Sequence, residues 1–119
     1  MATPEDVQNM AQDYNQLQQQ LQMVLIQRQQ LALQEKELEQ ALSEVQSSPG
    51  PFYRFIGSVL VARGKDQLQS ELSTEKEDVT SKSLLFEKQE KKLVERLTDV
   101  RKKLEAYAKS QRGSPRGAN

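Results

Sequence analysis

The stretch PFYRFIGSVLVARGKD, residues 51–66, decides how the rest of the chain is read. It is rich in aromatic and β-branched residues, which favour β-strands, and it has glycines near its middle and its end. Gly57 can take the positive φ of a tight turn between two short strands, so we predict a β-hairpin over residues 52–63. On either side lie two long segments, 5–48 and 65–112, that contain neither glycine nor proline.

The segment before the hairpin has the pattern of one long helix. Thr3 can act as its N-cap and Pro4 suits its first position, and two acidic residues then oppose the helix dipole. From Val7 onward, ten of twelve heptad core positions are apolar, and the two exceptions are Arg28 and Glu35. We expect a helix over residues 4–48, ended by the cluster Ser47-Ser48-Pro49-Gly50-Pro51.

The segment after the hairpin repeats the heptad pattern, with eight of eleven core positions apolar. Gly64 is an acceptable N-cap, and we expect a helix over residues 65–111 followed by a disordered tail over 112–119. Each helix would be roughly 65 to 70 Å long at 1.5 Å per residue. A helix with a single apolar seam must pair with another surface to be stable.

A short hairpin places the end of one helix beside the start of the other, so the two helices should run antiparallel. We therefore predict a mainly α fold in one domain, residues 1–119: a long antiparallel two-helix coiled coil joined by a short β-hairpin. If the helix ends are level, residue i lies near residue 112 − i. This register puts Glu35 beside Lys76, where an ion pair in the seam would fix the pairing.

Charge favours the same pairing of the two helices. Residues 1–48 carry seven acidic and two basic side chains, a net charge of −5, whereas residues 49–119 carry fifteen basic and ten acidic side chains, a net charge of +5. The two halves are electrostatically complementary, although each exposed pair contributes only a few tenths of a kcal/mol. Charge therefore guides pairing more than it adds stability.

Composition excludes several classes of function. The chain has no histidine and no cysteine, so it lacks imidazole bases, thiolate nucleophiles, disulfides and the usual zinc ligands. It also has no glycine-rich phosphate loop, so we expect no enzyme, no metal and no cofactor. No apolar run approaches the roughly 18 residues of a membrane span, and the first residues lack the order of a signal peptide. We expect a cytoplasmic protein that binds neither membrane nor nucleic acid.

Four stretches together resemble the β class of prefoldin subunits over nearly the whole chain. They are the first helix, FYRFIGSVLV (52–61), KDQLQSELSTEKEDV (65–79) and FEKQEKKLVERL (86–97). EKQEKKL, residues 87–93, is closer to archaeal members than to eukaryotic ones. One hairpin fits between Pro49 and Gly64, as expected for the β class, whereas the α class has two. The resemblance implies that the hairpins of several subunits assemble into a shared β-barrel platform.

The same resemblance implies an ATP-independent molecular chaperone. Its members form heterohexamers of two α and four β subunits, hold unfolded or nascent proteins at coiled-coil tips, prevent aggregation and deliver these clients to a group II chaperonin. In this chain both termini would form the tip. The hairpin residues expected to mediate subunit assembly are Phe52, Tyr53, Phe55, Ile56, Gly57, Val59, Leu60 and Val61.

Helix ends fray most easily, so apolar seam residues close to the termini are candidates for client contact. They are Val7, Met10, Tyr14, Val100, Leu104 and Tyr107. A weaker candidate lies outside the heptad positions, at Met23, Ile26 and Leu33. The alternative for both sets is that they only close the coiled coil. For the second set, a contact with a neighbouring subunit is a further alternative. For the whole chain, the alternative is a coiled-coil oligomerisation scaffold without chaperone activity.

Overall fold

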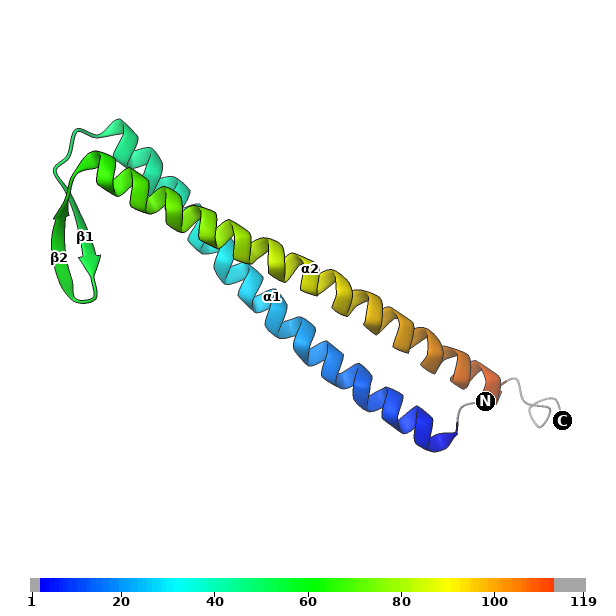
Figure 1. The fold of residues 1–119 in the computed structure, drawn as a ribbon. Coiled ribbons are helices and arrows are strands. Elements are labelled where there is room, and N and C mark those ends of the chain that lie inside the picture. The colour runs from blue at the N-terminus through cyan, green and yellow to red at the C-terminus, as the bar shows by residue number, and fades with distance from the viewer. Residues whose placement is uncertain (1–2, 113–119) are drawn as a thin grey trace. The chain divides into compact units, whose positions relative to one another are not determined.

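The computed structural model describes residues 3–112 of the 119-residue chain. Helix α1 spans Pro4–Ser47, strands β1 and β2 span Phe52–Ile56 and Val59–Arg63, and helix α2 spans Lys65–Arg112 (Figure 1). The fold class predicted from the sequence is confirmed: two long helices joined by a short antiparallel hairpin. The predicted tail over 112–119 lies outside the described residues, apart from Arg112 at the end of α2.

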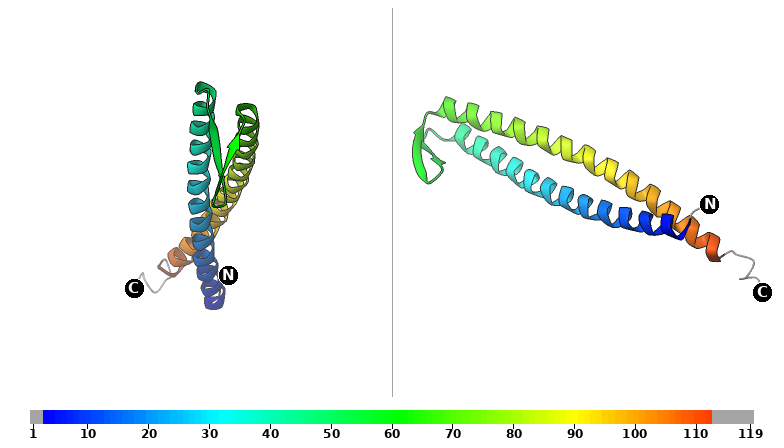
Figure 2. Two further views of the ribbon diagram at one scale, coloured as in Figure 1. Left: turned by 90° about the vertical axis from the view of Figure 1, so that its left-hand side faces the viewer. Right: turned by 60° about the horizontal axis from the view of Figure 1, so that its bottom comes forward.

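Contacts divide the chain into two units. The hairpin unit is Gln27–Phe86, and the terminal unit is Met1–Ile26 with Glu87–Asn119, of which residues 3–26 and 87–112 are described. Within each unit α1 and α2 are antiparallel neighbours (Figure 2). In the hairpin unit Glu39 pairs with Lys76, and in the terminal unit Tyr14 and Arg101 line one groove. Each helix therefore contributes one part to each unit.

Local hydrogen bonds explain where α1 begins and ends. The backbone N–H of Asp6 donates to Thr3 Oγ1 at 3.1 Å, and the N–H of Thr3 donates to Asp6 Oδ2 at 3.0 Å. This reciprocal cap confirms Thr3 as the N-cap. The helix ends at Ser47, one residue earlier than expected, because the Ser48 hydroxyl accepts the N–H of Gly50 at 3.2 Å and starts the turn.

The heptad seam is confirmed position by position. All twelve predicted seam positions of α1 and all eleven of α2 are buried or half-buried, and elsewhere within α1 the same is true only of Ala41. The most buried apolar side chains are Leu17 and Val24 in the terminal unit and Leu31, Val45, Leu68 and Leu72 in the hairpin unit. The last three form a cluster against which Leu38, Ala41, Leu42 and Phe52 pack.

The predicted helix register is wrong by three residues. Lys76 Nζ lies 3.5 Å from Glu39 Oε1 rather than pairing with Glu35, and Glu35 instead accepts a hydrogen bond from Thr80 at 3.2 Å. In both pairs the residue numbers add up to 115, as they do in every pair of the hairpin. The helix ends are not level because four residues connect α1 to β1 and one connects β2 to α2. That difference of three residues accounts for the shift.

Two glycines have the positive φ that side chains rarely adopt. Gly57, at φ 62°, occupies the first of two residues between β1 and β2, and Ser58 has no positive φ. This is the arrangement of a type II′ turn, which matches the twist of paired strands. Gly50 has φ 91°, and a Cβ there would lie 3.2 Å from the Phe52 ring. The predicted hairpin turn at Gly57 is therefore confirmed, and Gly50 has a second constraint that the sequence did not indicate.

Candidate functional site

The hairpin has one face against its own helices and one uncovered face. Phe52 packs against the apolar cluster of the helices, and Val61, on the same face, is half-buried. Successive strand residues alternate between faces, so the opposite face carries Tyr53, Phe55 and Leu60. These three side chains, with two more near the turn, Ile56 and Val59, are each at least half exposed. So many large apolar side chains on one small hairpin indicate a contact surface.

The eight residues expected to mediate assembly thus fall into three groups. Five are the exposed side chains just named, and Gly57 forms the turn. Phe52 and Val61 belong to the helix-facing side, and Phe52 has a packing role within its own chain. A role in assembly stays a prediction for all eight.

A cluster of four charged side chains lies between the hairpin and α2. Arg54 Nη1 is 3.0 Å from Glu71 Oε2, and Arg54 Nη2 donates to Glu75. Arg63 Nε is 3.1 Å from Glu71 Oε1. The hydrogen bond to Glu75, followed by that to Glu71, raises the pKa of the Arg54 guanidinium above its ordinary value. We call Arg54, Arg63, Glu71 and Glu75 the charged cluster.

Sequence reasoning missed the charged cluster and a second contact at the base of the hairpin. Lys65 Nζ, at the start of α2, donates to the carbonyl oxygens of Gln46 at 3.1 Å and Ser48 at 3.3 Å. Helix α1 has no basic residue in its own last turn, so Lys65 supplies the positive charge that suits a helix C-terminus. The available signal was the i, i+4 spacing of Glu71 and Glu75 opposite two arginines on one hairpin face.

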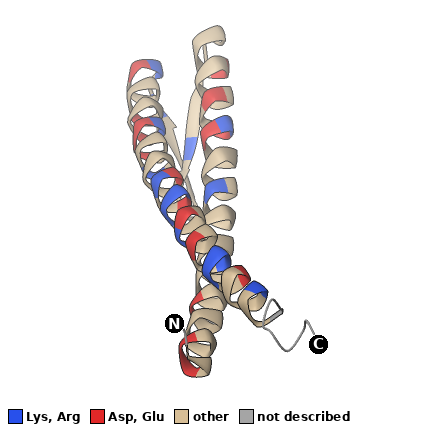
Figure 3. Cartoon of the chain, turned by 90° about the vertical axis from the view of Figure 1, so that its right-hand side faces the viewer, with Lys and Arg blue, Asp and Glu red and all other residues tan. Residues whose placement is uncertain are grey.

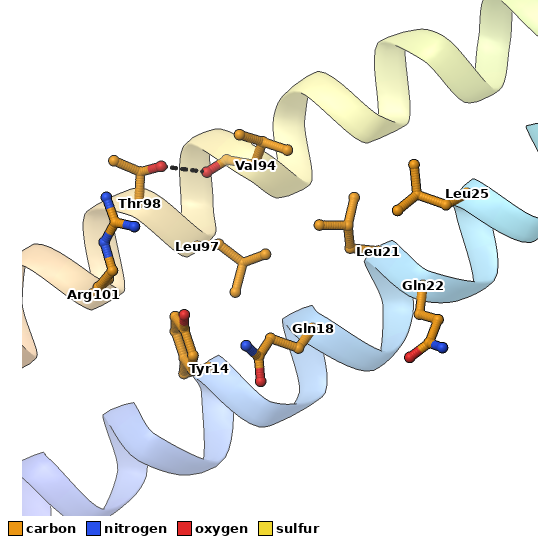
Figure 4. A pocket seen from close by; sticks show the side chains of 9 residues that line it. All are labelled: Tyr14, Gln18, Leu21, Gln22, Leu25, Val94, Leu97, Thr98 and Arg101. Carbon is orange, nitrogen blue, oxygen red and sulfur yellow. Dashed lines mark hydrogen bonds between the residues drawn. The ribbon is translucent and has the colours of Figure 1, made fainter.

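In the terminal unit, an open groove of about 670 Å³ runs between α1 and α2 (Figure 4). Leu25 and Val94 on its rim are 40% and 46% exposed, and the Thr98 hydroxyl donates to the Val94 carbonyl at 2.8 Å. Residues 14–27 of α1 carry no charge, in contrast to the charged surface of α2 (Figure 3). The lining residues are Tyr14, Gln18, Leu21, Gln22, Leu25, Val94, Leu97, Thr98 and Arg101.

The structure places the six predicted tip residues in the seam of the terminal unit, where all are half-buried: Val7, Met10, Tyr14, Val100, Leu104 and Tyr107. Tyr14 is the one of them that lines the groove. The weaker candidates are exposed. Met23 and Ile26, in the terminal unit, are 66% and 48% exposed, and Leu33, in the hairpin unit, is 59% exposed. Both sets stay predictions as client contacts.

Among residues 3–112, no helix is long and apolar enough to cross a membrane, and no three acidic side chains gather as metal ligands would.

The family profile described as "Prefoldin subunit" matches residues 8–111. The chain belongs to the prefoldin family. The resemblance to β-class subunits is confirmed by relatives and by a solved structure.

The prefoldin subunit beta of Archaeoglobus fulgidus is 37% identical over 92% of this chain and 97% of its own length. That of Thermococcus kodakarensis is 35% identical over 82% of this chain and 85% of its own length. The crystal structure of the prefoldin beta subunit from Thermococcus strain KS-1 superposes with a TM-score of 0.79 at 33% identity, covering 88% of this chain and 93% of that one. These matches identify the chain as a prefoldin chaperone subunit of the β class.

Proposed function

We propose that the chain is a β subunit of a hetero-oligomeric, ATP-independent chaperone of the archaeal type. The subunits join through their hairpins, and the chain-terminal ends of the helix pair bind unfolded or nascent proteins, prevent their aggregation and deliver them to a group II chaperonin. Two α and four β subunits in the cytoplasm form the working assembly. The observation that carries the proposal is the uncovered apolar face of the hairpin.

The hairpin supports assembly on energetic grounds. Fully burying one large apolar side chain contributes about 1.5–3 kcal/mol, so several of them covered together can exceed the loss of freedom on association. A two-stranded sheet also has an unpaired backbone edge on each strand, and other strands can add to such edges. An isolated two-stranded hairpin is marginal in water, which favours a hairpin completed by partner subunits.

The terminal unit supports client binding. Its seam near the termini is half-buried rather than buried, as at Val7, Met10 and Tyr107. Apolar side chains in such a seam become accessible when helix ends fray, and methionine adapts to varied partners. The groove between Leu25 and Val94 adds apolar surface in the same unit. A surface of this kind suits loose contact with many non-native chains.

The test mixes the chain with an α-class prefoldin subunit and measures complex mass by native mass spectrometry. Aggregation of a thermally unfolded client is then followed by light scattering without ATP. We expect a hexamer that suppresses scattering, and the double variant Phe55→Ser, Leu60→Ser should lose the hexamer. A wild-type chain that forms no complex with the α subunit would refute the assembly part. A hexamer that leaves aggregation unchanged would identify the chain as an oligomerisation scaffold.

The client site is tested separately from assembly. Removing residues 1–10 and 105–119 should leave the hexamer mass reduced only by the missing residues and should abolish suppression of aggregation. Substituting Met23, Ile26 and Leu33 by Gln should weaken suppression less. Full suppression by the truncated hexamer would remove the chain-terminal ends from the mechanism. Delivery is tested by adding a group II chaperonin with ATP and measuring the yield of refolded client.

A further inference from the structure

Two covalent connections and one packed side chain join the hairpin to its helices. Four residues that include Gly50 connect α1 to β1, and Gly64 alone connects β2 to α2. Pro49 and Pro51 restrict the connection from α1, whereas glycine has more backbone freedom than other residues, so the connection through Gly64 does not define the angle to α2 by itself. Phe52 attaches the base of the hairpin to the apolar core. A single attachment at the base permits the hairpin to rotate about it.

The charged cluster supplies a second attachment. Arg54 is the third residue of β1, two residues beyond Phe52, and Arg63 lies on the neighbouring strand. Both arginines contact Glu71, and Arg54 also contacts Glu75 one helical turn further along α2. The two strands are therefore attached to two successive turns of one helix. Phe52 and the charged cluster are thus two separate points at which the hairpin contacts its helices.

The geometry of the charged cluster suits a positioning role. Its four side chains are 18–42% exposed, so they are partly screened from water without being buried. A single ion pair at this exposure would contribute little, but a guanidinium that makes two directed contacts in a network restricts geometry more strongly. The described part of the chain also contains no buried side-chain nitrogen or oxygen without a partner.

We propose that the charged cluster holds the hairpin at one angle on α2 and thereby positions its opposite, apolar face for the partner subunit. The two faces are coupled because strand side chains alternate: fixing Arg54 toward α2 turns Tyr53 and Phe55 away from it. A surface held in its bound orientation loses less freedom on association, so assembly becomes tighter. This inference rests on the proposed function for the partner, whereas the fixed angle is a property of the single chain.

The angle is measured first, within one chain. Because the sequence has no cysteine, Ser58→Cys at the turn and Glu77→Cys on α2 can be spin-labelled without background, and both positions are exposed. Electron paramagnetic resonance then gives the distribution of distances between the labels. We expect one narrow distribution. The double variant Arg54→Gln, Arg63→Gln should broaden it while far-UV circular dichroism shows unchanged helix content.

Assembly is measured second, as the dissociation constant for the α-class subunit. The same double variant should bind about tenfold or more weakly, since an unpositioned hairpin must be ordered during association. The decisive variant exchanges every charge of the charged cluster: Arg54→Glu, Arg63→Glu, Glu71→Arg and Glu75→Arg. It should restore both the narrow distribution and most of the affinity, which a role of the arginines as direct partner contacts would not. Arg101→Gln, in the exposed pair with Glu105, is the matched control and should change neither.

The outcomes separate the two proposals. A narrow distribution in the double variant, or affinity equal to that of the wild type, overturns the positioning role while assembly itself stands. A wild-type chain that does not bind the α subunit overturns the proposed function, and the distance distribution still decides whether the charged cluster fixes the angle. If the double variant loses helix content, Arg54→Lys takes its place: it keeps the charge, loses the forked contact, and should broaden the distribution partly.

Discussion

The two units of the chain use the same heptad seam but differ in what is added to it. In the hairpin unit, Val45, Leu68 and Leu72 form a buried cluster, and ion pairs and hydrogen bonds link α1, α2 and the hairpin. In the terminal unit, the seam residues near the termini are half-buried, and an exposed ion pair, Arg101 with Glu105, joins two residues of one helix.

The proposed function places opposite requirements on the two units. A surface that assembles with defined partners benefits from one fixed geometry, which buried clusters and directed charge contacts provide. A surface that holds unfolded chains benefits from a seam that opens at little cost. The hairpin unit contains the buried cluster and the seam near the termini is half-buried, which is the difference that the proposed function calls for. Four experiments test this comparison, from the largest expected effect to the smallest.

The first compares one leucine from each unit. Leu68→Ala removes a side chain that is 6% exposed and leaves a cavity in the apolar cluster, so we expect a loss of about 3 kcal/mol in the free energy of unfolding. Leu104→Ala, in the half-buried seam of the terminal unit, should cost about 1 kcal/mol. Urea denaturation followed by circular dichroism measures both. Equal losses would show that the two units are packed alike.

The second experiment concerns Gly50, in the connector between α1 and the hairpin. Gly50→Ala places a Cβ at φ 91° and 3.2 Å from the Phe52 ring, so we expect a loss of about 2 kcal/mol in the free energy of unfolding. Gly57→Ala is the matched control. It has φ 62° but nothing within 4 Å, so it should carry the backbone strain alone, about 1 kcal/mol. If the control costs as much as Gly50→Ala, the contact with Phe52 contributes nothing.

The third removes the contact that Lys65 makes with the end of α1. Lys65→Met keeps the apolar part of the side chain but loses the hydrogen bonds to the carbonyls of Gln46 and Ser48, so the last turn should weaken by about 0.5–1 kcal/mol. Amide hydrogen exchange in the last turn of α1 should accelerate several-fold. Lys109→Met, an exposed lysine of the terminal unit, serves as the control and should leave those amides unchanged.

The fourth, and smallest, concerns the start of α1. Hydrogen bonds from Thr3 lower the pKa of Asp6, so the cap contributes above the ordinary pKa of aspartate and is lost as pH falls through the lowered value. Protection of the amides near Asp6, taken relative to the intrinsic exchange rate at each pH, should therefore fall at acid pH, while the hairpin turn serves as an internal reference. Thr3→Ala removes the contribution of the hydroxyl and keeps that of the backbone N–H, so it should raise the Asp6 pKa part of the way toward its usual range, as measured by nuclear magnetic resonance. An unchanged pKa would contradict the cap.

Much of the fold could be predicted because its signals are local. Prolines and glycines lie at the ends of both helices, the heptad pattern predicts every seam position, and Gly57 indicates the turn. The register could not be read from the heptads, since core positions are alternately three and four residues apart and a shift of three brings each position to, or within one residue of, the neighbouring core position. The register depends on the unequal lengths of the two connectors. The prediction ignored this difference because it treated the helix ends as level.

The charged cluster escaped prediction for a different reason. Its contacts join residues 8 to 21 positions apart along the sequence, and they exist only because the hairpin folds back on α2. The alternation of side chains along each strand predicts which residues share a face of the hairpin, but it does not predict which face lies against α2. The exposed apolar residues of the helices, in contrast, could be predicted from the sequence. The heptad pattern leaves Met23, Ile26 and Leu33 outside the seam, and all three are exposed.

The constant sum of 115 in the hairpin and in the pairs of Glu39 with Lys76 and Glu35 with Thr80 has a consequence for how such chains can change length. An insertion in one helix shifts every later pair, whereas equal insertions at matched positions of both helices preserve all of them. Seven residues on each side also keep every seam residue on its face. Paired heptad insertions in the terminal unit should therefore lengthen each helix by about 10 Å per step and leave the hairpin unit unchanged.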